Sequence, residues 1–583
     1  MDDKDRSEQP LTRHLDRRTF LKMTLGTTGV VLLAACGQAP AAGPAAGSAA
    51  QPAGSGAAAA SPAAPTTAAA AAGAPGTPKR GGTLSFGLDE DPPNWTPHNV
   101  VDCANQTVMA HIWSSLLRYN GKGELVGDVA ESWKWQDDKT MVFQLRKNVK
   151  WHNGDLLTAD QVVKSENDRL DPKTCIDGQF LSSAIAKWEA VDSNTVKCTL
   201  KEPNATMPRW LTTAPGRAFI LHPSYDAKTC GQSAAATIGT GPFKYKSYEP
   251  GAKVSLVRNT DYFIEGMPYL DAVDFMVVQD PDARVTDIRS GQLQMIGDID
   301  YQALPTLRKD PNIYIPEGKG FYGCRLTLDL TAPPTNDLKV RQALNFAINR
   351  QMIVDNVLAG EGTPVYGGII PPGRFGYDKK LDGTYKYDPA KAKALLAEAG
   401  WQDSNGVMVK DGQPMTLTYE TYGPNIWWSQ VAEVIQANLK DIGIAVKLDV
   451  KPWDEFKVIR KKYQDTPEGT PGSWTIMGGT IWGLDLADMP AYVMPGGYNW
   501  NRYNNPKLRD LLLKASATID DATREDLLRQ AQEVWTADAP DILVAWMTRS
   551  EAVRTNVKNF HHLDQDGCFG TLIWESYLDP QSA

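Results

Sequence analysis

Runs of alternating apolar and polar residues, and apolar residues at helical spacing, mark out most of the chain. The apolar-rich run at residues 141–146 (MVFQLR) predicts a strand, and the alternating run at residues 149–152 (VKWH) predicts its partner. Thr158, followed three residues later by Gln161, predicts a capping box and a helix over residues 158–170. The first half of the folded chain is therefore expected to pair strands and cover them with a helix.

The second half of the chain alternates helical and strand patterns. Helices are predicted on the face formed by Val340, Ala343, Leu344, Ala347 and Ile348, in the next segment up to Gly360, from Asp388-Pro389 to Gly400, and over residues 431–441. Strands are predicted at residues 415–420 and 442–448. Helices that alternate with strands indicate the α/β class, with a sheet covered by helices.

The N-terminal segment predicts export and anchoring. Residues 16–22 (DRRTFLK), with the twin arginine Arg17-Arg18, resemble a bacterial twin-arginine export signal. The apolar run at residues 23–35 is shorter than the roughly 20 residues needed to span a bilayer as a helix. It ends in LAAC, which resembles a lipobox, so Cys36 is expected to be acylated and to begin the mature protein. A chance cysteine after an ordinary signal is the alternative.

A long segment of biased composition follows. Residues 37–78 contain only Ala, Gly, Pro, Ser, Thr and Gln, without a charge or an aromatic ring. Such a segment cannot offset the entropy of ordering, so we predict a flexible tether with a mean reach of about 40 Å. The remaining roughly 500 residues exceed a single hydrophobic core and are expected to form two or three domains. No later segment is apolar enough to cross a membrane.

Charge, cysteine and motif content exclude several classes of function. The formal net charge of −9 argues against a nucleic-acid partner. An even number of further cysteines allows many pairings, or free buried thiols: Cys103, Cys175, Cys198, Cys230, Cys324 and Cys568. There is no Cys-x-x-Cys pair and no zinc spacing of histidines, so neither metal nor cofactor is predicted. No catalytic motif is found, and the chain is not expected to be an enzyme.

Several ordered segments carry a family resemblance. They are residues 131–135 (ESWKW), 143–146 (FQLR), 151–162 (WHNGDLLTADQV), 239–243 (GTGPF), 259–263 (NTDYF) and 337–344 (DLKVRQAL). Together they resemble the signature of the peptide/nickel-type, family 5, extracytoplasmic solute-binding proteins of ABC importers. The resemblance covers nearly everything from residue 81 to the C-terminus.

The resemblance implies a two-lobed periplasmic-binding-protein-like α/β fold, type II in its large form, with an extra subdomain in lobe one. The implied scheme is a signal peptide over 1–35, a lipidated cysteine and disordered tether over 36–78, lobe one over 79–330 including the extra subdomain at about 123–238, lobe two over 331–540, and a return to lobe one over 541–583. The last strand of lobe one is expected near residues 542–546, and the hinge crossings near residues 322–330 and 538–543.

The implied function is that of a receptor. Such a protein captures a solute by closing two lobes over it and hands it to the permease and ATPase subunits of an ABC importer. A monomer is expected, extracytoplasmic and anchored by lipid to the outer face of the cell membrane or in the periplasm. Peptides or other amine-bearing solutes are the first ligand class and oligosaccharides the alternative. Presentation to a signalling partner is a further alternative.

Aromatic and polar residues where the family places its cleft are the ligand candidates. The rings are Trp427, Trp428, Trp482 and Trp500, and the hydrogen-bonding groups are Tyr422, Asn425 and Asn499. Aromatic faces suit peptide side chains and sugar rings alike, and tryptophan is equally a core residue. Core packing is the alternative for each of these rings.

Charged candidates come from two segments. Residues 482–488 (WGLDLAD) resemble the segment in which peptide-binding members hold the ligand's α-ammonium with an aspartate, here Asp485. Family members continue with Asp-Pro, whereas here Met489 separates Asp488 from the proline. A helix cap or a solvated loop acid is the alternative for Asp485. Arg502 is a candidate for a ligand carboxylate, or for a rim arginine.

Overall fold

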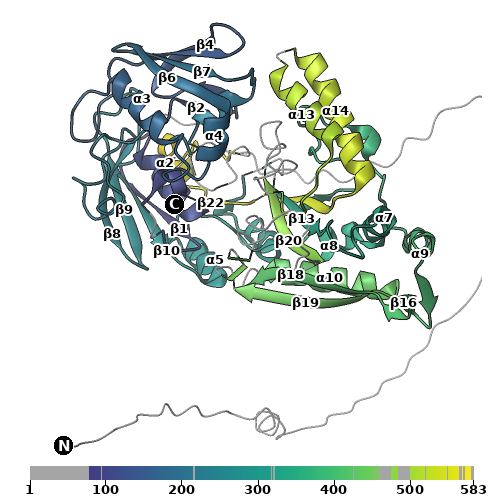
Figure 1. Ribbon diagram of the computed structural model, residues 1–583. Coiled ribbons are helices and arrows are strands. Elements are labelled where there is room, and N and C mark those ends of the chain that lie inside the picture. Colours follow the sequence, from purple (N-terminus) through teal and green to yellow (C-terminus); the bar gives the residue numbers. More distant parts are fainter. Residues whose placement is uncertain are drawn as a thin grey trace, which may run out of the picture. The chain divides into compact units, whose positions relative to one another are not determined.

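The computed structural model describes residues 78–92, 95–100, 102–213, 217–316, 318, 322–423, 426–452, 455–456, 458–459, 475–482, 499–518, 520–547, 549–563, 568 and 572–579. Within them the fold is mixed α/β and two-lobed, with one large sheet in each lobe and a smaller sheet attached to the first (Figure 1). No helix among these residues is both long and apolar enough to cross a bilayer.

The sheet of lobe one has seven strands in the order β12-β22-β11-β1-β10-β9-β8. Their bounds are β1 (Thr83–Leu88), β8 (Phe243–Glu249), β9 (Lys253–Arg258), β10 (Ala272–Val277), β11 (Met295–Ile296), β12 (Ile313–Tyr314) and β22 (Ala552–Arg554). The central strand β1 runs parallel to β10 and β11, whereas β9, β22 and β12 pair antiparallel to their neighbours.

Two helices of ten residues belong to lobe one. Helix α2 (Cys103–Ile112) begins where the Asp102 carboxylate accepts a hydrogen bond from the Asn105 N–H. Helix α5 (Pro281–Ser290) begins after Asp280 and ends at Gly291 in the left-handed conformation, with φ 87°. The short elements around them are η1 (Pro97–Asn99), η2 (Met207–Leu211), η3 (Tyr301–Ala303), α6 (Leu304–Leu307), η5 (Ile573–Glu575), and the strand pairs β2 (Leu117–Tyr119) with β3 (Leu125–Gly127) and β23 (Val557–Lys558) with β24 (Tyr577–Leu578).

A separate sheet of four antiparallel strands follows the start of lobe one, in the order β4-β5-β7-β6. Its strands are β4 (Ala130–Trp135), β5 (Thr140–Leu145), β6 (Ile185–Asp192) and β7 (Thr195–Leu200), and helices α3 (Ala159–Asp168) and α4 (Gly178–Ala184) lie against β6 (Figure 1). The capping box is confirmed, because Thr158 Oγ1 accepts from the Gln161 N–H at 3.4 Å and Gln161 Oε1 accepts from the Thr158 N–H at 3.1 Å.

The strand predicted at residues 149–152 is wrong. Only Lys150 makes an isolated bridge, to Leu156, and the chain turns where the Gly154 N–H bonds the Trp151 carbonyl. Val149 and Trp151 are buried. The alternating pattern therefore arises because a turn buries every second side chain, and not because the segment pairs as a strand.

The sheet of lobe two has six strands in the order β14-β21-β13-β20-β18-β19. Its strands are β13 (Tyr322–Leu328), β14 (Gly362–Pro364), β18 (Thr416–Gly423), β19 (Ala445–Pro452), β20 (Ile476–Trp482) and β21 (Asp541–Met547). The helices of this lobe are α7 (Leu338–Ala347), α8 (Arg350–Asn356), η4 (Lys379–Leu381), α9 (Pro389–Glu398), α10 (Ile426–Asp441), α13 (Pro506–Ala517) and α14 (Asp521–Asp538), and a small sheet contains β15 (Gln402–Ser404), β16 (Val407–Lys410) and β17 (Gln413–Pro414).

The final strand does not return to lobe one as expected. The run near residues 542–546 is β21, which pairs with β13 and β14 inside the six-stranded sheet, and lobe one regains the chain only at β22. The chain therefore passes from the sheet of lobe one to that of lobe two between β12 and β13, and returns between β21 and β22. A hinge at these two crossings stays a prediction. The other borders of the domain scheme stay a prediction.

Most predicted helices in lobe two form, with shifts at their ends. Helix α9 begins at Asp388, whose carboxylate accepts from the Lys391 N–H, and Gly400 follows it with φ 87°. Helix α8 ends at Asn356, before Gly360, so the glycine serves the following turn and not the helix cap. Strand β19 begins later than predicted, after the turn at Gly443.

One disulfide joins distant parts of lobe one. Cys103, at the start of α2, is bonded to Cys568, which lies 465 residues further along the chain. The remaining cysteines of the described chain are buried and free: Cys175, Cys198, Cys230 and Cys324. The disulfide therefore fixes the C-terminal segment to the first helix of lobe one.

Candidate functional site

Three parallel strands of lobe two end at one edge of the sheet. Strands β20, β18 and β19 run in the same direction and reach that edge at Trp482, Gly423 and Pro452. Loops beyond the carboxyl ends of parallel strands are where open α/β sheets bind ligands. Asn425 and Asp485 follow these ends, and both lie outside the described residues. Trp482 is the last residue of β20, and its backbone pairs with Tyr322 of β13. The side chain of Trp482 is not among the described parts of the structure.

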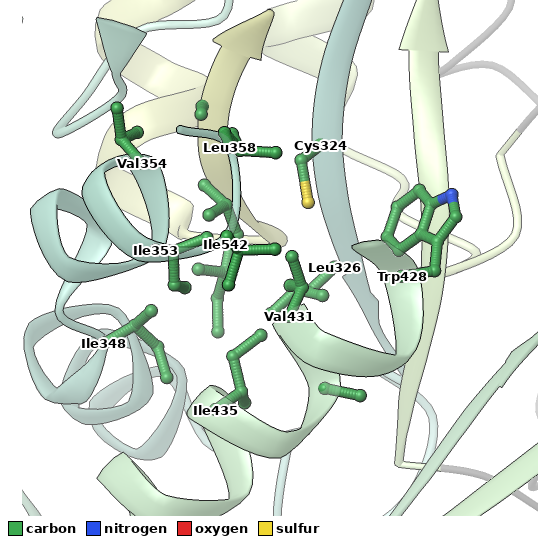
Figure 2. Close-up of a cluster of buried hydrophobic side chains, with 14 of the residues drawn as sticks. Cys324, Leu326, Ile348, Ile353, Val354, Leu358, Trp428, Val431, Ile435 and Ile542 are labelled. Carbon is green, nitrogen blue, oxygen red and sulfur yellow. The ribbon is translucent and has the colours of Figure 1, made fainter. Parts of the chain in front are cut away.

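The two adjacent tryptophans of α10 are packing residues. Trp428 is fully buried, at 0% exposure, and packs in the core with Leu326 and Val431 (Figure 2). Trp427 is 7% exposed and stacks on Trp428 with ring centroids 4.3 Å apart. It also makes an edge-to-face contact with Tyr322, with the two ring centroids 6.3 Å apart. The core alternative therefore describes these two rings.

A second group of rings adjoins the first through Tyr422, whose ring centroid lies 5.6 Å from that of Trp428. Phe456, Met477 and Trp500 form a buried group, and Tyr422 packs against it, with its ring centroid 5.1 Å from that of Phe456. We call these four residues the aromatic cluster. It contains two of the predicted ligand residues, Tyr422 and Trp500.

A buried ion pair supports the aromatic cluster. Arg325 of β13 bonds the Asp541 carboxylate at 3.1 Å, and its guanidinium lies 5.9 Å from the ring centroid of Trp500. The Asn501 amide donates to the same carboxylate at 3.0 Å. Burial raises the pKa of Asp541, and the Arg325 charge opposes that rise. The Asp541 carboxylate is therefore held by a cation and an amide within the protein.

The loop around Trp500 is held by its own polar groups. The Asn499 amide donates to the Tyr503 carbonyl at 2.8 Å, and its oxygen accepts from the Tyr503 N–H at 3.0 Å. Arg502 adopts a left-handed backbone conformation with φ 56°. Asn499 therefore shapes the loop that carries Trp500, and a ligand contact by Asn499 or Arg502 stays a prediction.

The sequence reading missed Glu420, the acid at the centre of β18. The residue is 3% exposed, and its Oε2 atom has no hydrogen-bond partner among the described residues. Register places it beside Met477 of β20 and on the same face of the strand as Tyr422. Burial raises the pKa of Glu420, with Lys451 opposing the rise and Asp449 adding to it. An acid within the apolar run at residues 415–421 was the available signal.

A charged group lies at the crossing between β21 and β22. Arg549 bonds Asp298 at 3.0 Å, and its guanidinium lies 5.3 Å from the ring centroid of Tyr322. Burial alone lowers the pKa of Arg549, but the charges of Asp298, Tyr322 and Asp89 outweigh burial and raise it. Burial, together with the Asp298 charge, also raises the pKa of Asp89. The crossing is therefore tied to lobe one by a partly exposed ion pair with Asp298 and to lobe two by a ring contact with Tyr322.

Other features do not supply a solute site. A cavity of about 40 Å³ in lobe one is lined by Arg118, Asp128, Tyr262 and Trp574, among others, and has room for a few water molecules. Among the described residues no group of three or more His, Cys, Asp and Glu side chains is placed to hold a metal ion.

Comparison with known proteins identifies the family to which this chain belongs. Residues 124–504 match the model of the bacterial extracellular solute-binding proteins, family 5, middle region. The chain belongs to this family. Family 5 proteins are substrate-binding receptors, which confirms the prediction that this receptor is not an enzyme. It acts outside the cytoplasm, where it captures a solute and delivers it to an ABC importer.

Several relatives of this family 5 receptor have known ligands or structures. Di/tripeptide-binding protein 1 of Pseudomonas aeruginosa (strain UCBPP-PA14) is 30% identical over 506 residues, which cover 81% of this chain and 89% of the relative. The oligopeptide-binding protein AppA from Bacillus subtilis, solved with a nonapeptide, is 25% identical with a TM-score of 0.73 and covers 86% of this chain and 100% of its own. AgaA from A. tumefaciens R10, solved with agropinic acid, is 27% identical with a TM-score of 0.73 and covers 85% of this chain and 99% of its own.

Proposed function

We propose that this receptor captures peptides or closely related amine-bearing solutes for import. The observation that carries the proposal is the alignment with a di/tripeptide-binding protein over 81% of the chain. The structure of AppA with a nonapeptide adds a second peptide-binding relative of the same fold. Agropinic acid, bound by AgaA, marks the broader range of solutes within this architecture.

Recognition of the ligand is proposed to centre on the loops at the ends of β18 and β20. Asp485 would hold the ligand's ammonium group through a charge-assisted hydrogen bond, which is strong where water is excluded. Trp482, Trp500, Tyr422 and Asn425 would contact the rest of the ligand. Arg502 would meet a ligand carboxylate with its planar guanidinium.

Capture is proposed to proceed by hinge closure about the two crossings between the lobes. A ligand that contacts both lobes favours the closed form by its differential affinity for that form. Micromolar affinity, about 8 kcal/mol, is enough for capture and permits release to the permease.

Export and attachment are part of the proposal. Arg17-Arg18 would direct export of the folded chain, Cys36 would carry the lipid, and residues 37–78 would tether a monomeric receptor to the membrane. Replacing both arginines by lysine should leave the protein in the cytoplasm, and Cys36→Ser should release it from the membrane fraction. Normal export of the dilysine variant would contradict the twin-arginine route.

The ligand class is tested by thermal shift of the purified full chain. Di- to hexapeptides and oligosaccharides are added singly, because a ligand at 100 times its Kd adds about 2.7 kcal/mol of stability. A shift with peptides that Asp485→Ala abolishes supports the peptide proposal. A shift with oligosaccharides that survives Asp485→Ala would instead establish the oligosaccharide alternative, for which Trp427 and Trp428 offer no exposed face.

A further inference from the structure

Glu420 is a buried acid in the binding region without a complete set of partners. Its side chain is 97% buried, and Oε2 accepts no hydrogen bond within the described structure. A carboxylate that has lost its water and gained no donor is costly, so such a group in a native fold needs an explanation.

A neighbouring acid on the same sheet shows what a structural carboxylate looks like here. Asp541 is equally buried, yet Arg325 bonds it at 3.1 Å and the Asn501 amide donates to it at 3.0 Å. Glu420 has no such pair. The nearest cation that acts on Glu420 is Lys451, whose Nζ is already bonded to Asp449 at 3.2 Å and to Glu455 at 3.3 Å.

The surroundings of Glu420 suit a cation. Tyr422, two residues along the same face of β18, belongs to the aromatic cluster, and Met477 of that cluster is the register partner of Glu420. Aromatic faces attract cations, and the acids Asp449 and Glu455 leave the local charge negative. An anionic ligand group would be repelled at this position.

The depth of Glu420 fits a side chain and not a ligand terminus. It lies three residues before the end of β18 at Gly423, about 10 Å from the strand-end loops. A flexible basic side chain can extend from those loops toward β18, whereas the α-ammonium is assigned to Asp485 by the proposed function.

We propose that Glu420 binds a cationic side chain of the ligand, so that the receptor prefers solutes carrying a lysyl ammonium or an arginyl guanidinium besides the α-ammonium. The inference rests on the proposed function, because it deepens the same site. The cation completes the hydrogen bonding of the carboxylate and replaces its lost water.

The test compares Ala-Lys and Ala-Arg with Ala-Ala and Ala-Glu on the full chain by calorimetry. The wild type should bind the two basic dipeptides at least about tenfold more tightly than Ala-Ala, and Ala-Glu most weakly. Glu420→Gln, which keeps the shape and removes the charge, should abolish this preference and leave the affinity for Ala-Ala unchanged. The matched control is Glu398→Gln, an exposed acid of the same lobe that pairs with Lys339, which should keep the preference.

The outcomes separate the two proposals. If Ala-Ala and the basic dipeptides bind equally and Glu420→Gln changes neither, the Glu420 inference is overturned and the peptide proposal stands. If Glu420→Gln weakens all four dipeptides equally, Glu420 supports the fold of the site and the inference is also overturned. If none of the dipeptides binds the wild type while oligosaccharides do, the proposed function fails and the inference fails with it. Thermal unfolding of each variant verifies that it is folded.

Discussion

The buried Glu420 carboxyl lowers the stability of the ligand-free protein by an amount that can be measured. Burial raises its pKa above the ordinary value of 4.5, so the folded state holds a proton more tightly than the unfolded state does. A raised carboxyl pKa stabilises the fold below 4.5, and that stabilisation is lost as the pH rises through the folded pKa. Ionisation of the buried Glu420 carboxyl therefore costs the folded state stability.

The first prediction is that Glu420→Gln stabilises the ligand-free protein. At pH 7 the free energy of unfolding should rise by about 1 to 3 kcal/mol, the cost of an unsatisfied buried group, and the gain should shrink toward pH 4.5. Urea denaturation at both pH values measures it. The exposed control Glu398→Gln should stay within about 0.5 kcal/mol of wild type. A loss of stability in Glu420→Gln would mean that the carboxylate is a structural acceptor.

The second prediction concerns pH and affinity. A cationic side chain binds the ionised form of Glu420, so the affinity for Ala-Lys should increase as the pH rises from 4.5 through the raised pKa of Glu420 and then level off. The difference between the Ala-Lys and Ala-Ala profiles isolates this residue from groups that serve both ligands. In Glu420→Gln the two profiles should be parallel. Parallel profiles in the wild type would exclude Glu420 from ligand binding.

At the scale of elements, local patterns were reliable where the cause of an element is local. The capping box at Thr158 and the cap and glycine around α9 lie within a few residues of the helices they bound, and both form as predicted. The prediction for β21 was wrong about its lobe. An apolar run indicates that a strand is central, but it does not indicate which sheet the strand joins. That choice depends on pairing with β13, more than 200 residues earlier in the chain.

In the candidate site, too, features with a local cause could be predicted from the sequence, and features that depend on distant contacts could not. The family segment around Trp482 falls at the end of β20, at the edge where β18 and β19 also end, and ligand binding at this edge stays a prediction. Trp428 could not be separated from a cleft residue by sequence, since its burial depends on the Leu326 strand behind it. Glu420 was overlooked because the sequence pattern of a strand does not show whether a buried carboxylate has a hydrogen-bond partner; only the folded structure does.

The third prediction tests the helix cap. Thr158→Ala removes an acceptor from the first turn of α3 and should lower its local stability by about 1 kcal/mol. Hydrogen exchange of the amides over residues 159–168 should speed up accordingly, about fivefold. The control is Thr286→Ala on α5, where the hydroxyl only donates to the Asp282 carbonyl within the helix. Equal effects on both helices would show that α3 is held by packing alone.

At the scale of the molecule, the disulfide couples the two ends of lobe one. Cys103 and Cys568 close a span of 465 residues, and cross-links of long loops restrict the unfolded chain strongly. Leu572, Ile573 and Trp574, beyond Cys568, also belong to the hydrophobic core that contains α2, so the disulfide adds a covalent link to an existing contact.

The fourth prediction follows from this connection. Replacing both Cys103 and Cys568 by alanine, or reducing the wild type, should destabilise lobe one by about 2 to 4 kcal/mol. Thermal unfolding with and without dithiothreitol measures the loss. The double variant should be insensitive to the reductant, because the remaining described cysteines are free. A further drop on reducing the double variant would reveal another disulfide.

The crossing at Arg549 controls a property of the whole receptor and not of one ligand. Its guanidinium bonds Asp298 of lobe one and lies over Tyr322, the first residue of β13 in lobe two. Removing Arg549 leaves the Asp298 carboxylate beside Asp89 without its cation. Without the pair the crossing gains freedom that closure must remove, and a ligand then spends more of its binding free energy on ordering the hinge.

The fifth prediction is that Arg549→Gln weakens the binding of Ala-Ala and Ala-Lys by the same factor, about tenfold, so that the preference set by Glu420 is unchanged. Uniform loss is expected because a shift between open and closed forms scales every affinity by the closed fraction. Calorimetry of both dipeptides gives the ratio, and X-ray scattering with and without ligand reports closure. The control is Arg308→Gln, which removes an exposed ion pair with Glu361 and should change neither affinity. A loss confined to Ala-Lys would place Arg549 in cation recognition, and unchanged affinities would show that the hinge does not depend on this ion pair.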